Sequence, residues 1–559
     1  MPQLFNACEY LLDRRLAAGD GPRTALTGAA GDVSYAALHD QVRRTATSLR
    51  KIGLQPEQRV LMLMADSPQF VVLYLAAMRM GAIPVPVSTM SRAGGVAELL
   101  QDSRARFLAV TREFAATAVA AAAEAPELAG MLAEEPLTDE ALPGEALPGE
   151  ALTGEALTGE ALTGEALTGE ALTGEARKGS PVPVYLLGEL AAGPADDTIY
   201  PTTADSPAFW LYTSGTTGRP KAAMHRHASI QAVCETYGTQ VLGIRRDDHC
   251  LSAAKAFFAY GLGNSLLFPL SVGATAVLEP APSRPDLIAD AARKYGATLF
   301  FAGPTFFAAM LRTGLAADAL AGVRLAASAG EALPASLYGR WTSHFGVDIL
   351  DGIGMTEVLH IFLSNRPGQV RAGTTGMAVP GYDLRVQDET GNEVPAGTPG
   401  TLFVRGDSTA TGYWSRYDAS RRVFQGEWLR TGDTYVRDAD GYYTCLGRTG
   451  DMLKAGGIWV SPAEVEAQLL AHPAVAQAVV VAAPDSEGLE KPVAYVILEP
   501  GQAATEDGLI EFCRQALPSF KRPRKVVFVV GYPTTATGKI RRVELRRMAA
   551  TILVPGESA

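Results

Sequence analysis

Residues 212–221, with the sequence YTSGTTGRPK, combine hydroxyl side chains, glycines and one lysine in a short segment. Glycine lets backbone N–H groups approach phosphate oxygens, hydroxyls add hydrogen-bond donors, and lysine supplies positive charge. The segment follows the apolar run AFWL, which is typical of a buried strand. The pattern indicates a loop that binds the phosphates of a nucleotide. Locally, an ordinary Ser/Thr/Gly turn has the same composition.

The spacing within this loop differs from that of P-loop nucleotidases. Those enzymes place four residues between two glycines and then Lys followed by Ser or Thr. Here Lys221 is followed by Ala222, and that glycine spacing is absent. A generic P-loop NTPase is therefore disfavoured.

Five further motifs follow the loop along the chain. They are SAGEAL at 328–333, DGIGMTE at 351–357, LRTGD at 429–433, GRTGDMLKAGG at 447–457 and PTTATGKIRR at 533–542. Together with the loop and in this order, they resemble the signatures of the adenylate-forming superfamily of acyl-CoA synthetases, firefly luciferases and peptide-synthetase adenylation domains. The resemblance extends from about residue 5 to residue 547. It implies an enzyme that activates a carboxylic acid with ATP as an acyl-adenylate.

The resemblance implies how charge is handled when the carboxylate meets the α-phosphate of ATP, a step that brings two anions together. Lys221 and the loop would bind the β- and γ-phosphates, Thr356 would contact the α-phosphate, and Glu357 would help to hold Mg²⁺, which proteins often bind through few carboxylates. The loop residues concerned are Thr213, Ser214, Gly215, Thr216, Thr217 and Gly218.

The same resemblance implies a nucleoside site. Asp433 would accept hydrogen bonds from the ribose hydroxyls, since an ionised aspartate only accepts, and Arg448 would assist. The adenine slot would be lined by Gly330, Glu331, Ala332, Asp351 and Gly352. Taken alone, Asp433 is equally a turn residue in its TGD sequence.

The last motifs imply a mobile C-terminal domain with two working positions. Lys539 would reach the carboxylate and the α-phosphate during adenylation. A swing about Gly450, where the family commonly has Asp or Lys, would then admit CoA, and glycine has the backbone freedom for such a hinge. The loop for the thioester step, beside the pantetheine tunnel, would contain Gly456, Gly457 and Trp459.

Residues 253–274 and the sequence DGIGMTEVLHIFLSNRPG resemble benzoate-CoA ligases more than fatty acyl ligases. The residues that would surround the acyl group are Ala259, Tyr260, Ala329, Gly354, His360 and Ile361. Small residues and one aromatic ring make a short, flat apolar slot suited to a single ring, although FFAYG is also explained by ordinary core packing. No aspartate lies near Phe258, where α-amino-acid adenylation domains bind the ammonium group.

His360 bears on which acid is bound. At the edge of the ring it would admit a small substituent such as the amino group of 2-aminobenzoate, and the alternative is a structural histidine with its hydrogen bonds satisfied. Benzoate and 2-aminobenzoate (anthranilate) are the leading substrates, with a lean to anthranilate.

Three functions stay open at this stage. The first is an aryl-CoA ligase that uses ATP, Mg²⁺ and CoA. The second is a stand-alone adenylation enzyme that loads an aryl acid onto a carrier protein. The third is an inactive homologue that acts as a binding or scaffold protein, which the presence of Lys221, Glu357, Asp433 and Lys539 disfavours.

Strand-like and helical segments alternate through most of the chain. Residues 60–87 predict a strand, a helix and a strand, which is a βαβ unit of a parallel sheet. Residues 373–432 predict a small antiparallel β subdomain, and the tail predicts a separate α+β domain. We therefore predict an α/β fold with a large N-terminal domain of layered βαβ subdomains (1–447) and a smaller mobile C-terminal domain (448–559).

A tandem repeat of five residues, ALPGE twice and then ALTGE five times, occupies residues 141–175. Its period fits neither a helix nor a strand, and each copy contains glycine. We interpret it as an expansion in a tolerant surface loop; a partner-binding arm is the alternative.

Composition limits the class of protein. The net charge of −11 falls to about −4 without the seven glutamates of the repeat, so a polyanion-binding surface is disfavoured. The five scattered cysteines have neither metal-ligand spacing nor a disulfide pattern. No secretory signal and no apolar run long enough to cross a bilayer are present, which predicts a cytoplasmic protein without nucleic-acid or membrane partners.

Overall fold

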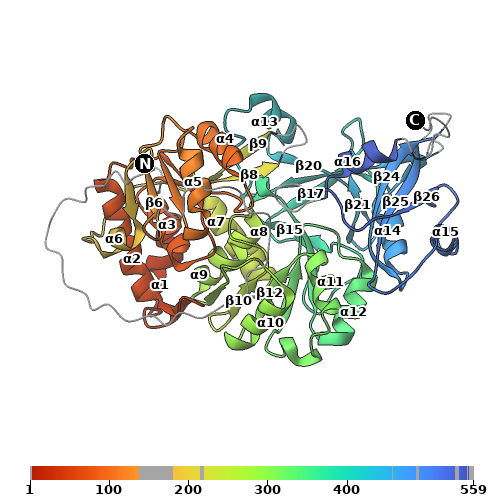
Figure 1. Cartoon of the computed structure of the whole chain (residues 1–559), viewed down its shortest axis with the longest axis horizontal. Coiled ribbons are helices and arrows are strands. Elements are labelled where there is room, and N and C mark those ends of the chain that lie inside the picture. The colour runs from red at the N-terminus through yellow and green to blue at the C-terminus, as the bar shows by residue number, and fades with distance from the viewer. Residues whose placement is uncertain are drawn as a thin grey trace.

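The computed structural model describes residues 3–137, 180–214, 219–455, 458–485, 490–534, 540–550 and 552. These residues form a large N-terminal domain of mixed α/β structure and a smaller C-terminal domain, coloured from red to teal and in blue in Figure 1. This arrangement confirms the predicted fold class. Among the described residues, no helix is long and apolar enough to cross a membrane.

The first sheet of the N-terminal domain is parallel throughout and has the strand order β4-β3-β5-β6-β7. Its strands are β3 Arg59–Leu63, β4 Ile83–Pro86, β5 Phe107–Val110, β6 Gly130–Ala133 and β7 Val184–Leu186. Helix α3, Pro68–Arg79, crosses from β3 to β4, as predicted for residues 60–87. It begins where the Ser67 hydroxyl caps the backbone N–H of Phe70 and Pro68 occupies the first turn.

The second sheet has nine strands within the described residues, in the order β16-β15-β14-β13-β12-β10-β11-β1-β2. The strands are β1 Thr24–Gly28, β2 Val33–Ser34, β10 His249–Ser252, β11 Thr275–Leu278, β12 Leu299–Ala302, β13 Leu325–Ser328, β14 Ile349–Gly354, β15 Ile361–Ser364 and β16 Met377–Ala378. Strands β10 to β14 and β1 are parallel, so their carboxyl ends meet at one edge. Such an edge is where open α/β sheets bind ligands.

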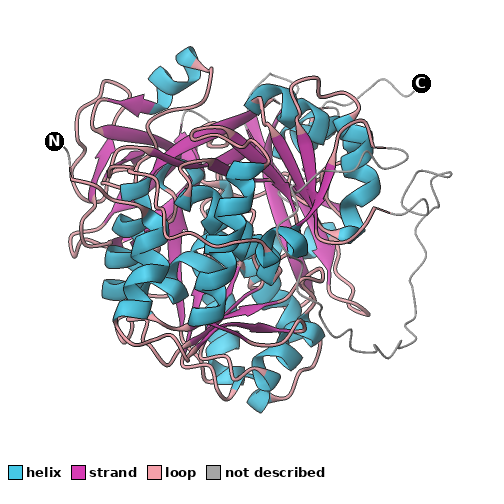
Figure 2. Cartoon of the chain, turned by 90° about the vertical axis from the view of Figure 1, so that its left-hand side faces the viewer, coloured by secondary structure: helices cyan, strands magenta, loops and turns pink. Residues whose placement is uncertain are grey.

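Helices flank the strands of both sheets, as Figure 2 shows. They are α1 Arg14–Ala17, α2 Tyr35–Lys51, α4 Ala93–Ser103, α5 Ala115–Ala122, α6 Leu187–Ala192, α7 His227–Val233, α8 Ala259–Leu262, α9 Phe268–Val272, α10 Pro285–Lys294, α11 Pro304–Arg312 and α12 Ala335–Phe345. Side chains between these layers form the buried core, including Tyr74, Phe209, Phe268 and Trp341. Burial on both faces explains why the parallel strands read as continuous apolar runs.

An antiparallel sheet follows, as predicted for residues 373–432, but its limits differ from that prediction. It contains β17 Asp383–Gln387, β18 Gly400–Arg405, β19 Phe424–Gln425, β20 Trp428–Arg437 and β21 Tyr443–Arg448, with helix α13, Tyr417–Val423, between β18 and β19. The sheet therefore extends to Arg448, whereas β16 pairs with β15 in the large sheet. The sequence pattern predicted short strands but not the sheet that each strand joins, because strand pairing depends on residues far apart in the sequence.

The C-terminal domain packs helices α14, Pro462–Leu470, and α15, Glu506–Arg514, against one face of a three-stranded sheet. That sheet contains β24 Val475–Pro484, β25 Glu490–Leu498 and β26 Lys525–Phe528. Helix α16, Arg542–Ala549, packs on the other face, and the short hairpin β22 Leu453–Ala455 and β23 Ile458–Val460 precedes α14. The position of the domain join near Arg448 stays a prediction.

Candidate functional site

The described ends of the predicted phosphate loop belong to an antiparallel pair of strands, which we call the phosphate hairpin. Its strands, β8 Pro207–Ser214 and β9 Pro220–Arg226, pair Thr213 with Lys221. This register places a hydroxyl and an ammonium group on neighbouring strands at the base of the tip. Residues 215–218, with Gly215, Thr216, Thr217 and Gly218, and the side chain of Ser214 lie outside the described residues. Ala222 is fully buried within β9.

Thr356 and Glu357 lie on a single turn, Thr356–Val358, that follows β14 at the carboxyl edge of the large sheet. The turn is tied to the phosphate hairpin, because His225 on β9 contacts the Thr356 carbonyl oxygen through Nε2 at 2.8 Å. His225 is almost fully buried and stacks on Phe209, with ring centroids 4.9 Å apart. Burial lowers its pKa to about 4, so the imidazole is neutral and donates Nε2–H to the carbonyl.

Glu357 is held by a residue that the sequence motifs did not single out. Its carboxylate accepts a hydrogen bond from the hydroxyl of Tyr413, 2.5 Å away, and its carbonyl oxygen accepts one from Ala410 N–H at 2.8 Å. The ammonium group of Lys221 lies 5.4 Å from the centre of the Tyr413 ring. Tyr413 therefore bonds to Glu357, the residue assigned to Mg²⁺, and its ring lies beside Lys221, the residue assigned to the phosphates. The available signal was the TGYW sequence at 411–414, but 56 residues separate Tyr413 from Glu357.

The donor set suits Mg²⁺ delivered with ATP. Within the described ranges, no three His, Cys, Asp or Glu side chains gather closely enough to hold a metal ion on their own. Mg²⁺ commonly binds one or two carboxylates and completes its coordination with phosphate oxygens and water. One Glu357 oxygen bonds to Tyr413, and the second oxygen has the chemistry of a Mg²⁺ ligand. The residues present thus fit a nucleotide-bound Mg²⁺.

The predicted ribose pair is assembled by the antiparallel sheet. Asp433 on β20 and Arg448 on β21 are register partners, and their side chains form an ion pair of 3.1 Å. Asp433 is buried and Arg448 is half exposed, so the arginine covers the carboxylate from the solvent side. This geometry brings together the two residues assigned to the ribose.

The residues assigned to adenine converge at the ends of β13 and β14. Ser328 and Asp351 pair across these strands, so residues 329–332 leave the sheet beside Gly352. The members of this group are Gly330, Glu331, Ala332, Asp351 and Gly352. Asp351 is buried, which raises its carboxyl pKa well above the usual value. Glu331 is exposed and accepts a hydrogen bond from the Thr305 hydroxyl at 2.9 Å.

The predicted acyl slot is assembled from helix α8 and strands β13 to β15. The Tyr260 hydroxyl donates to the Ala327 carbonyl at 2.8 Å, one strand residue before Ser328 and two before Ala329. Gly354 pairs with Ile361 across β14 and β15, and a side chain at position 354 would collide with the His360 backbone. All six predicted residues therefore lie on neighbouring segments: Ala259, Tyr260, Ala329, Gly354, His360 and Ile361.

His360 lies inside a cage of aromatic rings. The centroids of Phe268, Tyr237 and Tyr260 are 4.5, 5.3 and 5.5 Å from its ring. Gly263 makes room for it, because a Cβ there would stand 2.3 Å from His360 Cδ2. Burial lowers the His360 pKa to about 3, which keeps the ring neutral. Nε2 lies 3.3 Å from the Tyr260 carbonyl, and Nδ1 has no hydrogen-bond partner among the described residues.

The backbone between the phosphate and acyl groups is strained. Leu359, which separates the Thr356–Val358 turn from His360, has φ 67° and ψ −49°. A positive φ is unfavourable for a residue with a Cβ, and such strain persists only where the surroundings impose it. Leu359 is fully buried, so core packing holds the turn in this conformation.

The structure describes only some of the residues predicted to act in the domain swing. Lys539, Gly456 and Gly457 lie outside the described residues, and of Trp459 only the backbone, in β23, is described. The hinge candidate Gly450 accepts a 2.8 Å hydrogen bond from Arg546 through its carbonyl, and Arg546 also pairs with Asp451 at 2.7 Å. These contacts tie α16 to the predicted hinge.

The start of helix α16 is linked electrostatically to the N-terminal domain. Burial would lower the pKa of Arg542, but the charges of Glu466, Asp451 and Glu331 raise it. Glu331 belongs to the adenine group of the N-terminal domain, whereas Arg542 begins α16, directly after the bridge between Thr534 and Ile540. Glu331 of the predicted adenine group therefore acts on the charge of Arg542 in the C-terminal domain.

Comparison with known proteins agrees with this geometry. Residues 13–414 match the family model described as AMP-binding enzyme, and residues 464–539 match that of the AMP-binding enzyme C-terminal domain. The chain belongs to the AMP-binding enzyme family. Benzoate–CoA ligase of Thauera aromatica is 40% identical over 98% of this chain and 96% of that protein.

Solved structures of AMP-binding enzymes are similar over the whole length. The anthranilate CoA ligase AuaEII, in complex with anthranoyl-AMP, superposes with a TM-score of 0.86 at 34% identity, over 99% of this chain and 98% of that one. A benzoate CoA ligase from Burkholderia xenovorans LB400 gives 0.83 at 38% identity, over 97% and 100%. The family assignment predicted from the six motifs is confirmed.

Proposed function

We propose that this protein is an ATP-dependent aryl acid:CoA ligase. It joins a single-ring aromatic carboxylate to AMP, releasing pyrophosphate, and then transfers the aryl group to the thiol of CoA, releasing AMP. One observation carries this function: the aromatic cage of His360 lies only three residues beyond the Thr356–Glu357 turn. An acid bound in the acyl slot beside this cage would present its carboxylate next to the α-phosphate site. The full-length similarity to benzoate and anthranilate CoA ligases supports the same reaction.

The side chains divide the work of the first half-reaction. Lys221 and Thr213 bind phosphate oxygens from the paired strands of the hairpin, and Thr356 contacts the α-phosphate. Asp433 and Arg448 hold the ribose, which orients the nucleotide relative to the acid. Mg²⁺, when bound with ATP, neutralises part of the phosphate charge, and Glu357 is its proposed protein ligand. Fixing both reactants in line lowers the entropic cost of the reaction.

The C-terminal domain would take one position for adenylation and a second position for thioester formation. In the first position, the loop of Lys539 would act in adenylation, and the electrostatic influence of Glu331 on Arg542 supports an approach of this domain to the adenine group. Rotation about Gly450 would withdraw this loop and bring in the segment of Gly456, Gly457 and Trp459 for thioester formation. The Arg546 contacts to Gly450 and Asp451 have to break or move with the hinge during that rotation.

We further propose 2-aminobenzoate as the preferred acid, with benzoate the second candidate. His360 is neutral and its Nδ1 is unpaired among the described residues. An amino group at the edge of the ring would hydrogen-bond to this nitrogen, which benzoate leaves unsatisfied. A buried polar atom without a partner costs about 1–3 kcal/mol, which is on the order of tenfold in kcat/KM between the two acids.

The test is a kcat/KM survey of CoA thioester formation over benzoate, its amino and hydroxy isomers and a medium-chain fatty acid. A His360→Phe variant, with His344→Phe on an exposed helix position as the control, assigns any amino preference. We expect His360→Phe to lower kcat/KM for 2-aminobenzoate about tenfold and to spare benzoate. Equal rates for fatty and aryl acids would contradict the function, and an unchanged aryl ratio would contradict the role of His360.

A carrier protein as the acyl acceptor is the second candidate function, because it shares the adenylation step. Supplying either CoA or a phosphopantetheinyl carrier with each acid separates the two. We expect thioester formation with CoA alone.

A further inference from the structure

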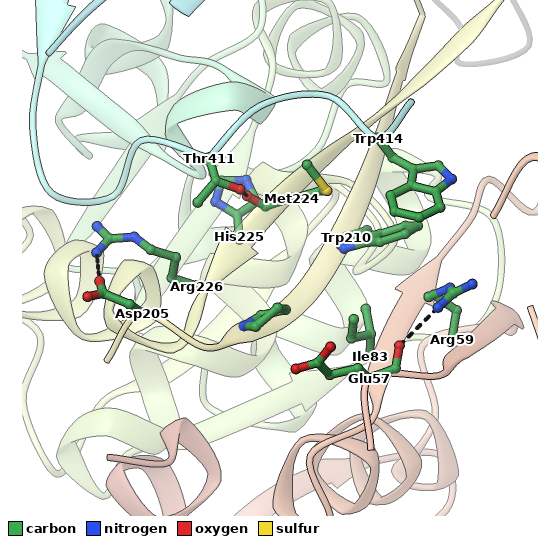
Figure 3. A pocket seen from close by; sticks show the side chains of 11 residues that line it. Glu57, Arg59, Ile83, Asp205, Trp210, Met224, His225, Arg226, Thr411 and Trp414 are labelled. Atoms are coloured by element: carbon green, nitrogen blue, oxygen red, sulfur yellow. Dashed lines mark hydrogen bonds and ion pairs between the residues drawn. The ribbon is translucent and has the colours of Figure 1, made fainter. Parts of the chain in front are cut away.

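A cavity of about 250 Å³ lies beside the phosphate hairpin. We call it the rear cavity, and Figure 3 shows the ring of side chains around it. Three parts of the N-terminal domain meet there. The first sheet and the turn before it contribute Glu57, Arg59 and Ile83, and the segment before α13 contributes Thr411 and Trp414. The hairpin and the turn before it contribute Asp205, Pro207, Trp210, Met224, His225 and Arg226. Small molecules bind preferentially at such junctions.

Two indole rings form one wall of the rear cavity. Trp210 and Trp414 pack together with ring centroids 4.9 Å apart. The Trp414 Nε1–H donates a hydrogen bond to the Asp102 carbonyl at 2.9 Å. Trp210 is only 3% exposed, and its Nε1–H has no hydrogen-bond partner among the described residues. Its nitrogen end points toward the middle of the ring of lining residues (Figure 3). A buried indole N–H usually finds an acceptor, so a ligand acceptor would complete it.

Positive charge lies beside the same two rings, toward the end of the Trp210 indole away from its nitrogen (Figure 3). The guanidinium of Arg59 is 5.3 Å from the Trp210 ring and 5.5 Å from the Trp414 ring. Its hydrogen bonds go to the carbonyls of Ser103, Glu57 and Arg104, and within the described part of the chain no carboxylate lies within ion-pairing distance. A half-buried arginine that only carbonyls contact retains its full charge for an anion.

The other charged residues that line the rear cavity are Arg226, Asp205 and Glu57. Arg226 is neutralised by Asp205 and also donates to the Asp407 carbonyl at 2.7 Å. Glu57 is exposed, and its backbone has a positive φ of 61°, which is unfavourable for a residue with a Cβ. Its carboxylate lies across the cavity from Trp210 (Figure 3), where it would accept from a hydroxyl or amino substituent. The anion therefore belongs at the Trp210–Arg59 end.

We propose that the rear cavity is a second binding site for a single-ring aromatic carboxylate, distinct from the acyl slot. The carboxylate would accept from Trp210 Nε1–H and face Arg59, and the ring would rest on Trp210 and Ile83. The volume lies below the roughly 300–1,000 Å³ of sites for drug-sized ligands, which excludes a nucleotide or a CoA thioester and fits one ring.

Such a ligand would contact the machinery of the first half-reaction. Trp210 lies three residues before Thr213 on β8, and the neighbouring lining residue His225 bonds to Thr356. The acid that the enzyme activates has the chemistry of the proposed ligand, so the site would register the concentration of that acid at the phosphate hairpin.

The experiment measures binding of labelled benzoate and 2-aminobenzoate by equilibrium dialysis to the full-length protein. The acyl slot is first saturated with a stable aryl-sulfamoyl adenosine, a non-reactive mimic of the aryl-adenylate. We expect one further equivalent of acid to bind. Failure of the acids to bind at millimolar concentration to the filled enzyme would overturn the second site, while aryl-CoA ligase activity would be unaffected.

Two variants assign that equivalent to the rear cavity. Trp210→Phe removes the N–H donor but keeps an aromatic face, and Thr411→Tyr fills the mouth at an exposed position. We expect Trp210→Phe to weaken binding of the additional equivalent of acid about tenfold. We expect Thr411→Tyr to abolish it. Trp428→Phe, on β20 away from the cavity lining, is the matched control and should bind as the unmodified chain does. If neither cavity variant changes the second event, the rear cavity is not the site.

Discussion

The hydroxyl of Tyr413 donates a hydrogen bond to the carboxylate of Glu357, while the face of the same ring lies 5.4 Å from the ammonium of Lys221. One buried aromatic side chain thus holds the anion assigned to Mg²⁺ and borders the cation assigned to the phosphates. Strand β9 fixes this arrangement further, because Ala223 forms a backbone bridge with Tyr413. The distance between the two charges is set by a residue that carries no charge itself.

Tyr413→Phe should therefore raise the Mg²⁺ concentration required for half-maximal adenylation. The variant keeps the ring beside Lys221 but releases Glu357, whose rotamers then compete with the Mg²⁺-binding one. We expect kcat/KM for MgATP to fall about tenfold, since a hydrogen bond to a charged group contributes about 1.5–3 kcal/mol. Pyrophosphate release measured over a Mg²⁺ titration checks this.

Tyr382→Phe is the control for that experiment, because it also removes a buried hydroxyl, bonded to Ser408, but does not contact Glu357. A Tyr413→Phe enzyme with an unchanged Mg²⁺ requirement would contradict a positioning role, even if its stability fell.

Lys539→Ala should separate the two half-reactions. Loss of the lysine removes the cation that meets the carboxylate and α-phosphate, so adenylate formation should fall by about 10²–10³. Transfer to CoA from supplied aryl-adenylate should remain largely intact. Rapid-quench assays of each half-reaction test this, with Lys525→Ala as the control, since Lys525 pairs with Glu506 at 2.8 Å in the same domain. Equal losses in both steps would contradict the domain swing.

Deleting residues 141–175 should leave turnover and melting temperature nearly unchanged. The segment belongs to the connection between β6 and β7, which are adjacent parallel strands. Residues 134–140 and 176–183 would remain, and a connection of about a dozen residues suffices between parallel strands. Thermal unfolding and steady-state rates of the deleted protein provide the measurement. A drop of several degrees in Tm would assign a structural role to the repeat.

Lowering the pH from 7.5 to 5.5 should lower the melting temperature. Burial lowers the pKa of His225 and His227 to about 4 and that of His360 to about 3. Below pH 6.5 the unfolded chain takes up protons at these sites and the folded chain does not, so stability is lost as the pH falls. Each histidine contributes up to about 1.4 kcal/mol per pH unit in that range.

Two buried carboxyls oppose this trend. Burial raises the pKa of Asp66 to about 6 and that of Asp351 well above its usual value. Below its raised pKa, each carboxyl binds a proton in the folded state that it does not bind in the unfolded state, which offsets part of the histidine effect. Calorimetry across this range should show a smaller slope for His360→Asn and an unchanged slope for the exposed His344→Asn. An unchanged slope in His360→Asn would show that this histidine is already protonated in the folded state.

Local chemistry made the phosphate hairpin, the βαβ units and the reaction class predictable from the sequence. The glycines, hydroxyls and lysine of residues 212–221 lie within ten positions, so their composition alone predicts a phosphate-binding loop. Apolar runs such as those of β3 and β12 indicate buried parallel strands because both faces of the sheet are covered. The six ordered motifs assigned the family, whereas the interpretation of the tandem repeat as an insertion stays a prediction.

Only the tertiary structure decided which side chains meet. Tyr413 reaches Glu357 across 56 residues, His225 reaches Thr356 across 131, and Trp210 meets Trp414 at the rear cavity. Strand pairing and core packing bring such residues together, and neither leaves a periodic trace near the residues themselves. The polarity of His360 was visible in the sequence, but its neutral charge arises from the aromatic rings that exclude water from it. Residue type determined the available chemistry, and burial determined its protonation state and its partners.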